Sequence, residues 1–235
     1  MQKISKTCDL STVYKQWEEN LEADNIPHPI FKHTKTRQDY YEDVKMQLLR
    51  CQGGLCIYSE QRLCPLALLT DDKWQNGKYI YQDLDKQAKG DVEHFDDTKK
   101  ANKAWLWDNL FMSDHTFNNN KGVKSLDPRL RPTNENFNPF YLFDYDIVTH
   151  RFAPNARLEF TDKDLYDAVK KAIDEVLKLN SIQQDRKDEI FKKYAPNYEL
   201  GAEVDVYQFP TAWEFWQRKQ AHHKTDEHST PDEYE

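Results

Sequence analysis

The chain has 235 residues, a formal net charge of −8 and a hydrophobic fraction of 38%, enough apolar material for one large domain or two small ones. It contains no run of about 18 apolar residues, so no transmembrane helix is expected, and the first residues lack the apolar segment of a secretory signal. A free-standing nucleic-acid-binding protein is usually basic, because phosphate contacts supply most of its affinity. This acidic chain would need a local basic face or a partner to hold a polyanion.

The first elements in chain order are two helices. Residues 11–23 and 37–51 each repeat apolar side chains at helical spacing. Gly53 and Gly54 follow the second repeat and would end that helix. We therefore expect a helical region over residues 1–50.

The middle of the chain reads differently. Residues 51–64 combine turn glycines with cysteines, and residues 71–87 carry an Asn-Gly turn signal beside a short aromatic strand. The stretch 92–122 then brings together an acid–histidine pair, a Trp-Asp-Asn-Leu and an asparagine-rich Lys-Gly. The next segment, 126–140, is rich in proline and asparagine and is expected to be an extended linker.

The last third is expected to be a hairpin followed by helices. Residues 140–154 suggest the hairpin, and residues 162–180 carry a clear amphipathic helix. Further helices are expected over 182–194 and 211–220, and residues 221–235 are expected to be disordered. The apolar stripe of the first of these helices consists of Leu165, Val169, Ala172, Ile173 and Val176.

Cysteine usage bears on the compartment. The four cysteines, Cys8, Cys51, Cys56 and Cys64, are too few for a disulfide scaffold in a chain of this length. With no export signal, reduced thiols and a cytoplasmic location are expected.

Three side chains in the 92–122 stretch are of the types that hydrolyse a phosphodiester bond. Water must lose a proton, and a neutral histidine such as His94, with a reference pKa of about 6.5, is suited to take it. The leaving oxygen develops negative charge, which a divalent metal can stabilise. Mg²⁺ prefers hard oxygen ligands, and the Glu93 carboxylate and the Asn118 amide are such ligands.

Backbone geometry sets the condition for these residues to share one site. Neighbours in a strand, such as Glu93 and His94, point to opposite faces, so the strand end must twist or bulge. A helix that begins near Asp114 would then direct Asn118 back toward His94. Lys121 lies one turn along the same helix face and could contact a phosphate.

These residues resemble the His-Asn-His/Asn signature of the HNH (ββα-metal) nucleases. More narrowly, C-I-Y-S-E (56–60), V-E-H-F (92–95), W-D-N-L (107–110) and N-N-N-K-G (118–122) resemble the PtuB-like HNH nuclease subunit of Septu and Septu-like retron anti-phage systems. L-K-L-N-S-I-Q-Q-D-R (177–186) is similar to the helical segment that follows the nuclease core in that group. The order and spacing of these motifs together are more specific than any one of them.

The resemblance implies a fold and an activity. The fold is α+β, with a ββα-metal nuclease core over 51–125 between mostly helical regions over 1–50 and 126–220 and an acidic tail over 221–235. The activity is a metal-dependent endonuclease that hydrolyses phosphodiester bonds in DNA, or in RNA, as the effector of an anti-phage defence system.

The resemblance also implies roles for individual residues. His94 would be the general base, and Glu93 and Asn118 would hold Mg²⁺ or Mn²⁺, with Asn119 or Asn120 as alternatives because the triple asparagine leaves the register open. Asn109 would be the middle asparagine, which braces the loop and orients His94. Lys121 would be an auxiliary phosphate contact.

The stretch 99–131 is locally basic, against the acidic balance of the chain. Lys99 and Lys100 in this stretch are candidate nucleic-acid contacts, with a solvated helix face as the alternative.

The chain departs from the family at the structural zinc site. Many HNH proteins clamp the ββα unit with two Cys-x-x-Cys pairs, which here read Cys56-x-x-Ser59 and Asp114-x-x-Phe117. These side chains cannot complete a tetrahedral thiolate site, so no structural Zn²⁺ is expected in the usual place. Packing would then have to fix the loop, through Phe95, Trp105, Trp107, Leu110 and Phe117. An alternative zinc site from Cys51, Cys56, Cys64 and His115 stays open.

A PtuA-like ATPase subunit is the partner that the resemblance implies, and it could supply the affinity for nucleic acid that an acidic chain lacks. The helical region 162–220 is the expected docking surface, and no membrane role is expected. Two alternatives remain: a catalytically degenerate HNH-like module that docks an ATPase or a nucleic acid, and an adaptor without a nucleic-acid role.

Overall fold

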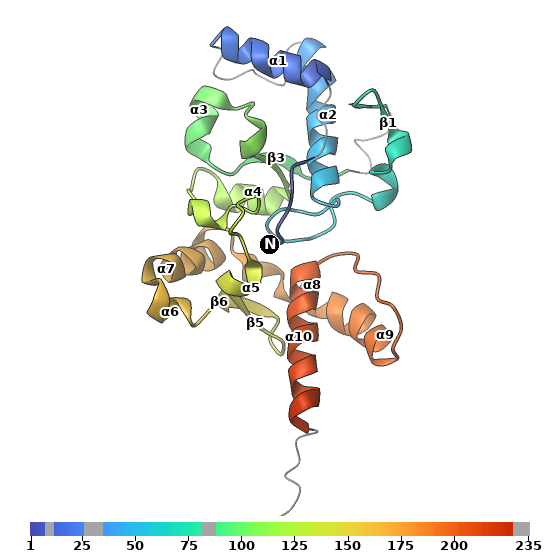
Figure 1. Cartoon of the computed structure of the whole chain (residues 1–235), viewed down its shortest axis with the longest axis vertical. Coiled ribbons are helices and arrows are strands. Elements are labelled where there is room, and N and C mark those ends of the chain that lie inside the picture. The colour runs from blue at the N-terminus through green and yellow to red at the C-terminus, as the bar shows by residue number, and fades with distance from the viewer. Residues whose placement is uncertain (8–11, 26–34, 81–87, 228–235) are drawn as a thin grey trace, which may run out of the picture.

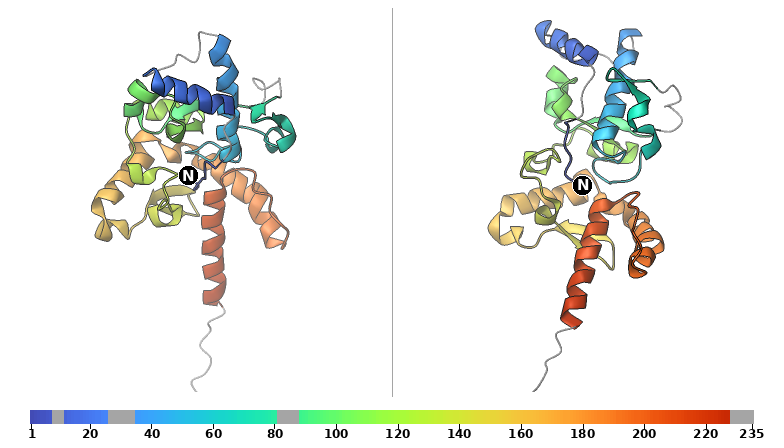
Figure 2. Two further views of the ribbon diagram at one scale, coloured as in Figure 1. Left: turned by 45° about the horizontal axis from the view of Figure 1, so that its top comes forward. Right: turned by 45° about the vertical axis from the view of Figure 1, so that its right-hand side comes forward.

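The computed structural model describes residues 1–7, 12–25, 35–80 and 88–227. It is an α+β structure of many short helices and three separate two-stranded antiparallel sheets. Figure 1 shows two tiers, with the first half of the chain above and the second half below, and the N-terminus lies between them. The two further views in Figure 2 keep this division.

The upper tier begins with the two expected helices. Helix α1 spans Thr12–Ala23 and helix α2 spans Lys35–Cys51. After α2 the chain passes through Gly53 and Gly54 with φ of 60° and 74°. Both angles lie in the left-handed region, where glycine has no steric penalty, so these two residues end the helix as expected.

The Asn-Gly signal also forms its turn. Strands β1 (Trp74–Gln75) and β2 (Lys78–Tyr79) pair in antiparallel order. Asn76 and Gly77, which join the strands, have φ of 52° and 74°. A two-residue Asn-Gly hairpin turn of type I′ requires such positive φ angles at both residues. The end of the expected aromatic segment, residues 81–87, lies outside the described residues.

The centre of the upper tier is a strand, a strand and a helix in sequence. Strand β3 (Asp91–His94) pairs antiparallel with strand β4 (Leu110–Ser113), and His94 lies opposite Leu110. Between the strands lie helix α3 (Lys100–Lys103) and a 3₁₀ turn over Trp107–Asn109. Trp107 therefore lies in a turn between the two strands.

Helix α4 follows β4 directly and spans His115–Lys121. Its N-cap is Asp114, whose carboxylate accepts the amide of Thr116, a standard cap that satisfies one of the first amide groups of a helix. The helix thus begins at the predicted residue. The aromatic and aliphatic packing expected around it is present, because Phe95, Trp105, Trp107, Leu110 and Phe117 are all buried.

Segment 126–140 is not the extended linker that its composition suggests. It contains a 3₁₀ turn over Pro128–Leu130, which leads to helix α5 (Pro139–Leu142). Leu130 and Phe137 are buried in the core. Proline and asparagine serve here as first-turn residues and caps of short helices, since Asn138 accepts the amide of Phe140.

The lower tier contains the expected hairpin, strands β5 (Phe143–Asp146) and β6 (Arg151–Pro154). The apolar stripe of the predicted 162–180 helix is buried as expected. That helix is α7 (Lys163–Lys171), which continues as a π turn over Ala172–Val176. The tier also contains helices α6 (Leu158–Thr161), α8 (Gln183–Glu189), α9 (Ala195–Glu199) and α10 (Pro210–Glu227).

Helix α10 continues to Glu227, beyond the predicted end at residue 220. The expected disorder is therefore wrong for residues 221–227, and residues 228–235 lie outside the described part of the chain. In the helix, Trp213 and Trp216 stack with ring centroids 4.9 Å apart. In Figure 1 the C-terminal half of α10 projects away from both tiers. No helix in the described ranges is long and apolar enough to cross a membrane.

Glu60 makes one of the contacts between the tiers. Its buried carboxylate forms an ion pair with the amino group of Met1 at 2.8 Å and accepts the amide of Thr211 at 2.9 Å. The amide of Ile4 also donates to the carbonyl of Pro132 at 3.1 Å. The first residues of the chain thus run between the two tiers and bond to both.

Candidate active site

Glu93 and Lys121 form a buried ion pair at the junction of β3 and α4. The Lys121 ammonium lies 2.7 Å from Glu93 Oε1 and donates to the backbone carbonyl of His94 at 2.8 Å. The Tyr58 hydroxyl donates to the same Glu93 oxygen at 3.3 Å. Burial raises the pKa of the Glu93 carboxyl, and Lys121 is the largest influence that opposes the rise.

This position corrects the role expected for Lys121. Its side chain is 1% exposed, so its ammonium neutralises Glu93 instead of meeting a phosphate at the surface. The sequence spacing placed Lys121 on the face of the helix that carries Asn118. It did not predict that the partner of Lys121 would be Glu93 and not a phosphate. A lysine one turn after Asn118 faces β3, and the nearest acceptor there is the carboxylate of Glu93.

His94 is half-buried. Its ring contacts the residue after α3, whereas the Glu93 side chain contacts α4. Nε2 lies 2.7 Å from the carbonyl oxygen of Ala104, which directly follows α3. A carbonyl oxygen only accepts hydrogen bonds, so Nε2 carries the proton in this contact. A neutral His94 ring then has its lone pair on Nδ1, the form that a general base requires.

Asn109 is fully buried and braces the chain directly after His94. Its Oδ1 accepts the amide of Asp96 and its Nδ2 donates to the carbonyl of Asp96, both at 2.9 Å. Its backbone carbonyl accepts the amide of Phe95, also at 2.9 Å. The two residues that follow His94 are therefore tied to Asn109 by three hydrogen bonds. Such a bracing role is the one expected for the middle asparagine.

Asn118 is half-buried on α4, one turn before Lys121. Lys121 itself reaches β3, so Asn118 lies on a helix that contacts the strand carrying Glu93 and His94. The neighbouring asparagines differ from it. Asn119 is exposed, and Asn120 donates to the carbonyl of Leu177 in the lower tier at 3.4 Å. The structure thus gives Asn120 a separate bonding partner away from β3.

Cys56, Ser59 and Asp114 occupy positions where many HNH proteins have zinc ligands. Here they are joined by hydrogen bonds to the Cys56 sulfur. Cys56 Sγ accepts the amide of Ser59 at 3.5 Å and the amide of Asp114 at 3.2 Å. The Ser113 hydroxyl lies 3.8 Å from the same sulfur. The chain segments that two cysteine pairs would clamp in a zinc site therefore meet at Cys56.

The other candidate zinc ligands have separate partners. Cys51 is disulfide-bonded, which contradicts the expected reduced state of that residue, whereas Cys56 and Cys64 are free and buried. The ring of His115 lies 2.7 Å from Asp91. Among the described residues, no group of three histidine, cysteine, aspartate or glutamate side chains could hold a metal ion.

The basic residues around α3 are exposed. Lys99 lies 3.9 Å from Asp96. Lys100 begins α3, and its charge, like that of Lys121, opposes the rise that burial causes in the pKa of Glu93. Lys100 is thus close enough to the site to act on its electrostatics, as a candidate phosphate contact must be.

Sequence reasoning missed two residues near this site. Tyr58 lies within the C-I-Y-S-E motif, but only the fold shows that its hydroxyl reaches Glu93. Lys6 contacts the Trp107–Asn109 turn from the first segment of the chain. A lone lysine so far away in the sequence carries no signal of that contact.

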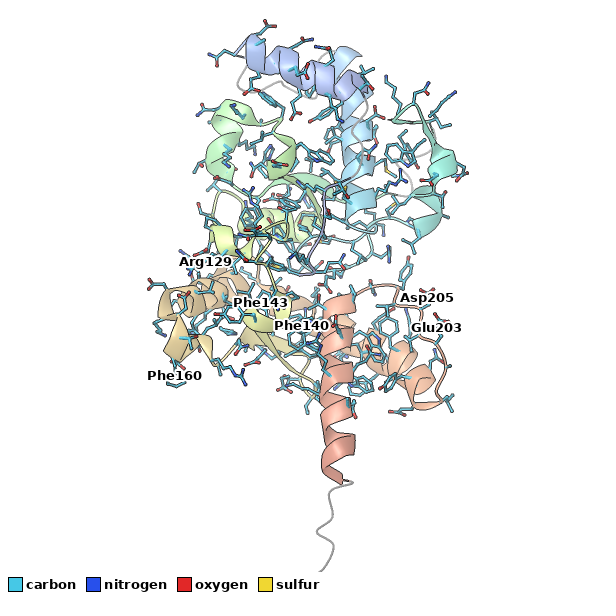
Figure 3. The ribbon with its side chains drawn as sticks, viewed as in Figure 1. Arg129, Phe140, Phe143, Phe160, Glu203 and Asp205 are labelled. Carbon is cyan, nitrogen blue, oxygen red and sulfur yellow. The ribbon has the colours of Figure 1, made fainter. Side chains whose placement is uncertain are left out.

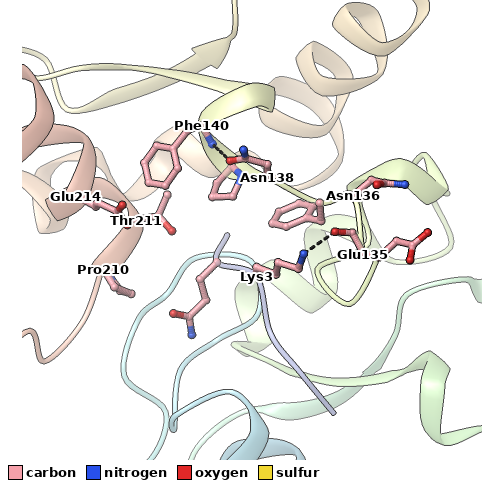
Figure 4. A pocket seen from close by; sticks show the side chains of 11 residues that line it. Lys3, Glu135, Asn136, Asn138, Phe140, Pro210, Thr211 and Glu214 are labelled. Atoms are coloured by element: carbon pink, nitrogen blue, oxygen red, sulfur yellow. Dashed lines mark hydrogen bonds between the residues drawn. The ribbon is translucent and has the colours of Figure 1, made fainter. Parts of the chain in front are cut away.

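A separate pocket of about 630 Å³ lies between the N-terminal segment, the 135–140 segment and the start of α10. Figure 4 shows Lys3, Asn138 and Thr211 around it. None of the residues that line it belongs to the β3–β4–α4 unit. The pocket is therefore distinct from the candidate active site.

No protein-family model matches the chain, and no curated protein matches it.

Proposed function

We propose that the chain is an HNH-type endonuclease that hydrolyses phosphodiester bonds in DNA or RNA, with His94 as the general base. One observation carries this proposal: the position of His94 is fixed from two sides. Its Nε2 contacts the carbonyl of Ala104, and Asn109 holds the following residues, including both backbone groups of Asp96. A ring fixed in this way keeps one tautomer and one orientation, which a general base needs.

In this mechanism His94 Nδ1 takes a proton from the water that attacks phosphorus. Protonation gives an imidazolium whose Nε2–H stays on the Ala104 carbonyl, so the ring need not move during the transfer. Lys100, exposed at the start of α3, supplies positive charge beside the site and is the proposed phosphate contact, with Lys99 as a weaker candidate because it faces Asp96.

The residues present fit a divalent cation in donor type. Glu93 and Asn118 offer hard oxygens, and a bound cation would share or take the place of the Lys121 ammonium beside Glu93. Both described contacts of the carboxylate go to Oε1. Mg²⁺ or Mn²⁺ held by Glu93 and Asn118 would stabilise the negative charge that develops on the leaving oxygen.

We also propose an ATPase subunit of the PtuA type as the partner. An acidic chain needs help to hold a polyanion, and the lower tier has apolar side chains at its surface. Phe160, 88% exposed, points away from the body of the tier in Figure 3, and Leu200 is 84% exposed. Phe160 is the proposed anchor for that partner, because aromatic side chains are enriched at protein interfaces relative to the rest of the surface.

One observation favours the second candidate function, a degenerate HNH-like module that binds without cutting. The carboxylate of Glu93 is already neutralised by Lys121 in a buried pair. A metal would have to share or displace that lysine, and a module without metal would keep the fold while losing hydrolysis.

A cleavage assay separates these candidates. Purified chain is incubated with plasmid DNA and with RNA, with Mg²⁺ or Mn²⁺, alone and with its ATPase. Nicking in either arrangement supports the endonuclease. Absence of nicking in both, with retained binding, favours the binding module, and no binding of a short duplex at low salt favours an adaptor.

A further inference from the structure

Lys6 lies in the N-terminal segment and makes an unusual set of contacts for a lysine. Its ammonium donates to the backbone carbonyls of Trp107 at 2.7 Å and Asp108 at 3.2 Å, and also to that of Leu110. It lies over the Phe111 ring, 3.9 Å from the ring centroid. Three carbonyls and an aromatic face thus surround one cation.

Burial disfavours the charged form of the Lys6 side chain. Desolvation lowers the pKa of Lys6 to about 7, with Asp108 opposing the change and Arg131 adding to it. A cation kept in such a place must be compensated by its hydrogen bonds. The three carbonyls are therefore the partners that retain Lys6 in this position.

The residues that Lys6 holds belong to the turn that supports His94. The turn carries Asn109, which bonds both backbone groups of Asp96. Leu110, which ends the turn, pairs directly with His94 across the sheet. Lys6 is thus connected to both sides of the proposed base through a single turn.

The rest of the N-terminal region supports the same loop. The Tyr14 hydroxyl donates to the carbonyl of Trp105 at 3.0 Å, and the Glu18 carboxylate accepts the amide of Trp107 at 3.3 Å. Trp105 follows Ala104, the residue whose carbonyl contacts His94. The segment 104–109 is therefore contacted by Lys6, Tyr14 and Glu18 of the N-terminal region. It is also tied to β3 and the residues after it, through His94 and through the bonds of Asn109 to Asp96.

We infer that Lys6 is a positioning residue for His94, acting through the Trp107–Leu110 turn. The role assigned to His94 rests on the proposed function, but the coupling between the two residues does not. Loss of the Lys6 ammonium removes one donor from each of three carbonyls and loosens the turn, although the Trp107 carbonyl keeps the amide of Leu110. The Asn109 contacts and the His94–Ala104 bond then open more often.

The test uses the full chain uniformly labelled with ¹⁵N, so that both histidine rings and backbone amides are observed. Hydrogen exchange is measured by NMR at the His94 Nε2–H and at the Asp96 amide, which donates to Asn109. In Lys6→Met both exchange rates should rise by roughly tenfold or more relative to the parent. Lys6→Arg, which keeps the charge and several donors, should restore most of the protection.

Two controls separate positioning from general destabilisation. Lys3→Met removes the same charge from the same segment but from a side chain that bonds Glu135, and it should leave His94 exchange unchanged. Val169→Ala opens a cavity in the lower tier, where Val169 is fully buried. It should lower the unfolding free energy without selective exchange at His94 and Asp96.

Unchanged exchange at both sites in folded Lys6→Met would overturn the inference, whether or not the chain cuts nucleic acid. If Lys6→Met does not fold, Lys6→Gln replaces it with a neutral donor, and the same comparison with Lys6→Arg decides. Failure of the nuclease proposal would instead appear as absence of cleavage by the parent. The two failures are therefore read from different measurements.

Discussion

The Glu93 carboxylate and the Lys121 ammonium lie 2.7 Å apart, with side chains 5% and 1% exposed. The pair joins β3 to α4, and Lys121 also holds the carbonyl of His94. A buried pair of this kind seldom stabilises a fold more than apolar residues would, yet removal of one partner leaves a costly bare charge. The contact therefore fixes the geometry of the β3–β4–α4 unit.

We predict that Lys121→Met lowers the free energy of unfolding by about 3–5 kcal/mol, because Glu93 is left buried without a cation. The pKa of Glu93, already raised by burial, should rise further without Lys121. A raised carboxyl pKa means that stability falls as pH rises through it, so the deficit should be smaller near about pH 5 than near about pH 8. Urea denaturation at both pH values measures this.

Matched variants identify the source of that loss. Lys124→Met removes a lysine from the same region, and it should cost much less. Within the described residues the Lys124 ammonium donates to the backbone carbonyls of Asn120 and Glu175 at the surface. Glu93→Gln combined with Lys121→Met should cost less than the sum of the single variants. Additive losses would show that the two residues do not act as a pair.

We predict that Asn109→Ala lowers the free energy of unfolding by about 2–4 kcal/mol, because both backbone groups of Asp96 lose their side-chain partner in a buried place. Cleavage should also fall by roughly tenfold or more, since the chain after His94 is released. Asn136→Ala, on an exposed residue that lines the separate pocket, is the control and should change neither quantity. Full cleavage by Asn109→Ala would remove the bracing role.

How much of this site follows from the sequence differs from residue to residue. The caps and turns were readable because they are local: Asp114 begins α4, and Asn76-Gly77 form the hairpin turn. The motif spacing singled out Asn109, whereas its hydrogen bonds to Asp96 follow from the fold. The contact of Lys121 with Glu93 was not readable, because spacing gives a helix face but not which acceptor that face meets.

Long-range partners explain the remaining differences. Lys6 reaches its turn across about a hundred residues, and no local pattern encodes that contact. The 126–140 segment looked like a linker by composition, although its apolar residues Leu130 and Phe137 pack into the core. Composition describes local preference, and burial of these two residues depends on tertiary contacts that override it.

We predict that acidification destabilises the lower tier through His150. This fully buried residue has its Nδ1 2.7 Å from the Tyr145 hydroxyl. Burial first, and then Lys187 and Arg186, lower its pKa from 6.5 to about 4, against an opposing effect of Asp146. Between these values the unfolded chain binds the proton that the folded chain refuses, so stability falls as pH drops from 6.5 toward 4.

Thermal unfolding across this pH range measures the effect. His150→Asn suits the position, whose φ is 57°, because asparagine tolerates the left-handed region. At neutral pH the variant should have a lower melting temperature than the parent, because it has lost the bond to Tyr145. On acidification its melting temperature should fall less than that of the parent. Parallel pH profiles of parent and variant would exclude His150 as the titrating group.

We predict that the purified chain carries less than one equivalent of zinc. Cys56 Sγ already accepts amides from Ser59 and Asp114, and neither of those residues nor Phe117 supplies a thiolate. Elemental analysis after extensive dialysis against metal-free buffer measures the content. One full equivalent, lost in Cys56→Ser, would refute the argument.

The most direct measurement of the central claim is the cleavage rate of His94→Ala beside that of His115→Ala. Both remove an imidazole, but His115 is an exposed residue of α4 that faces Asp91. With Mn²⁺ and the proposed ATPase partner present, parent and His115→Ala should cut the nucleic acid. His94→Ala should not cut, while keeping its melting temperature and its affinity for the ATPase. Cutting by His94→Ala at the parental rate would contradict the general-base role of His94.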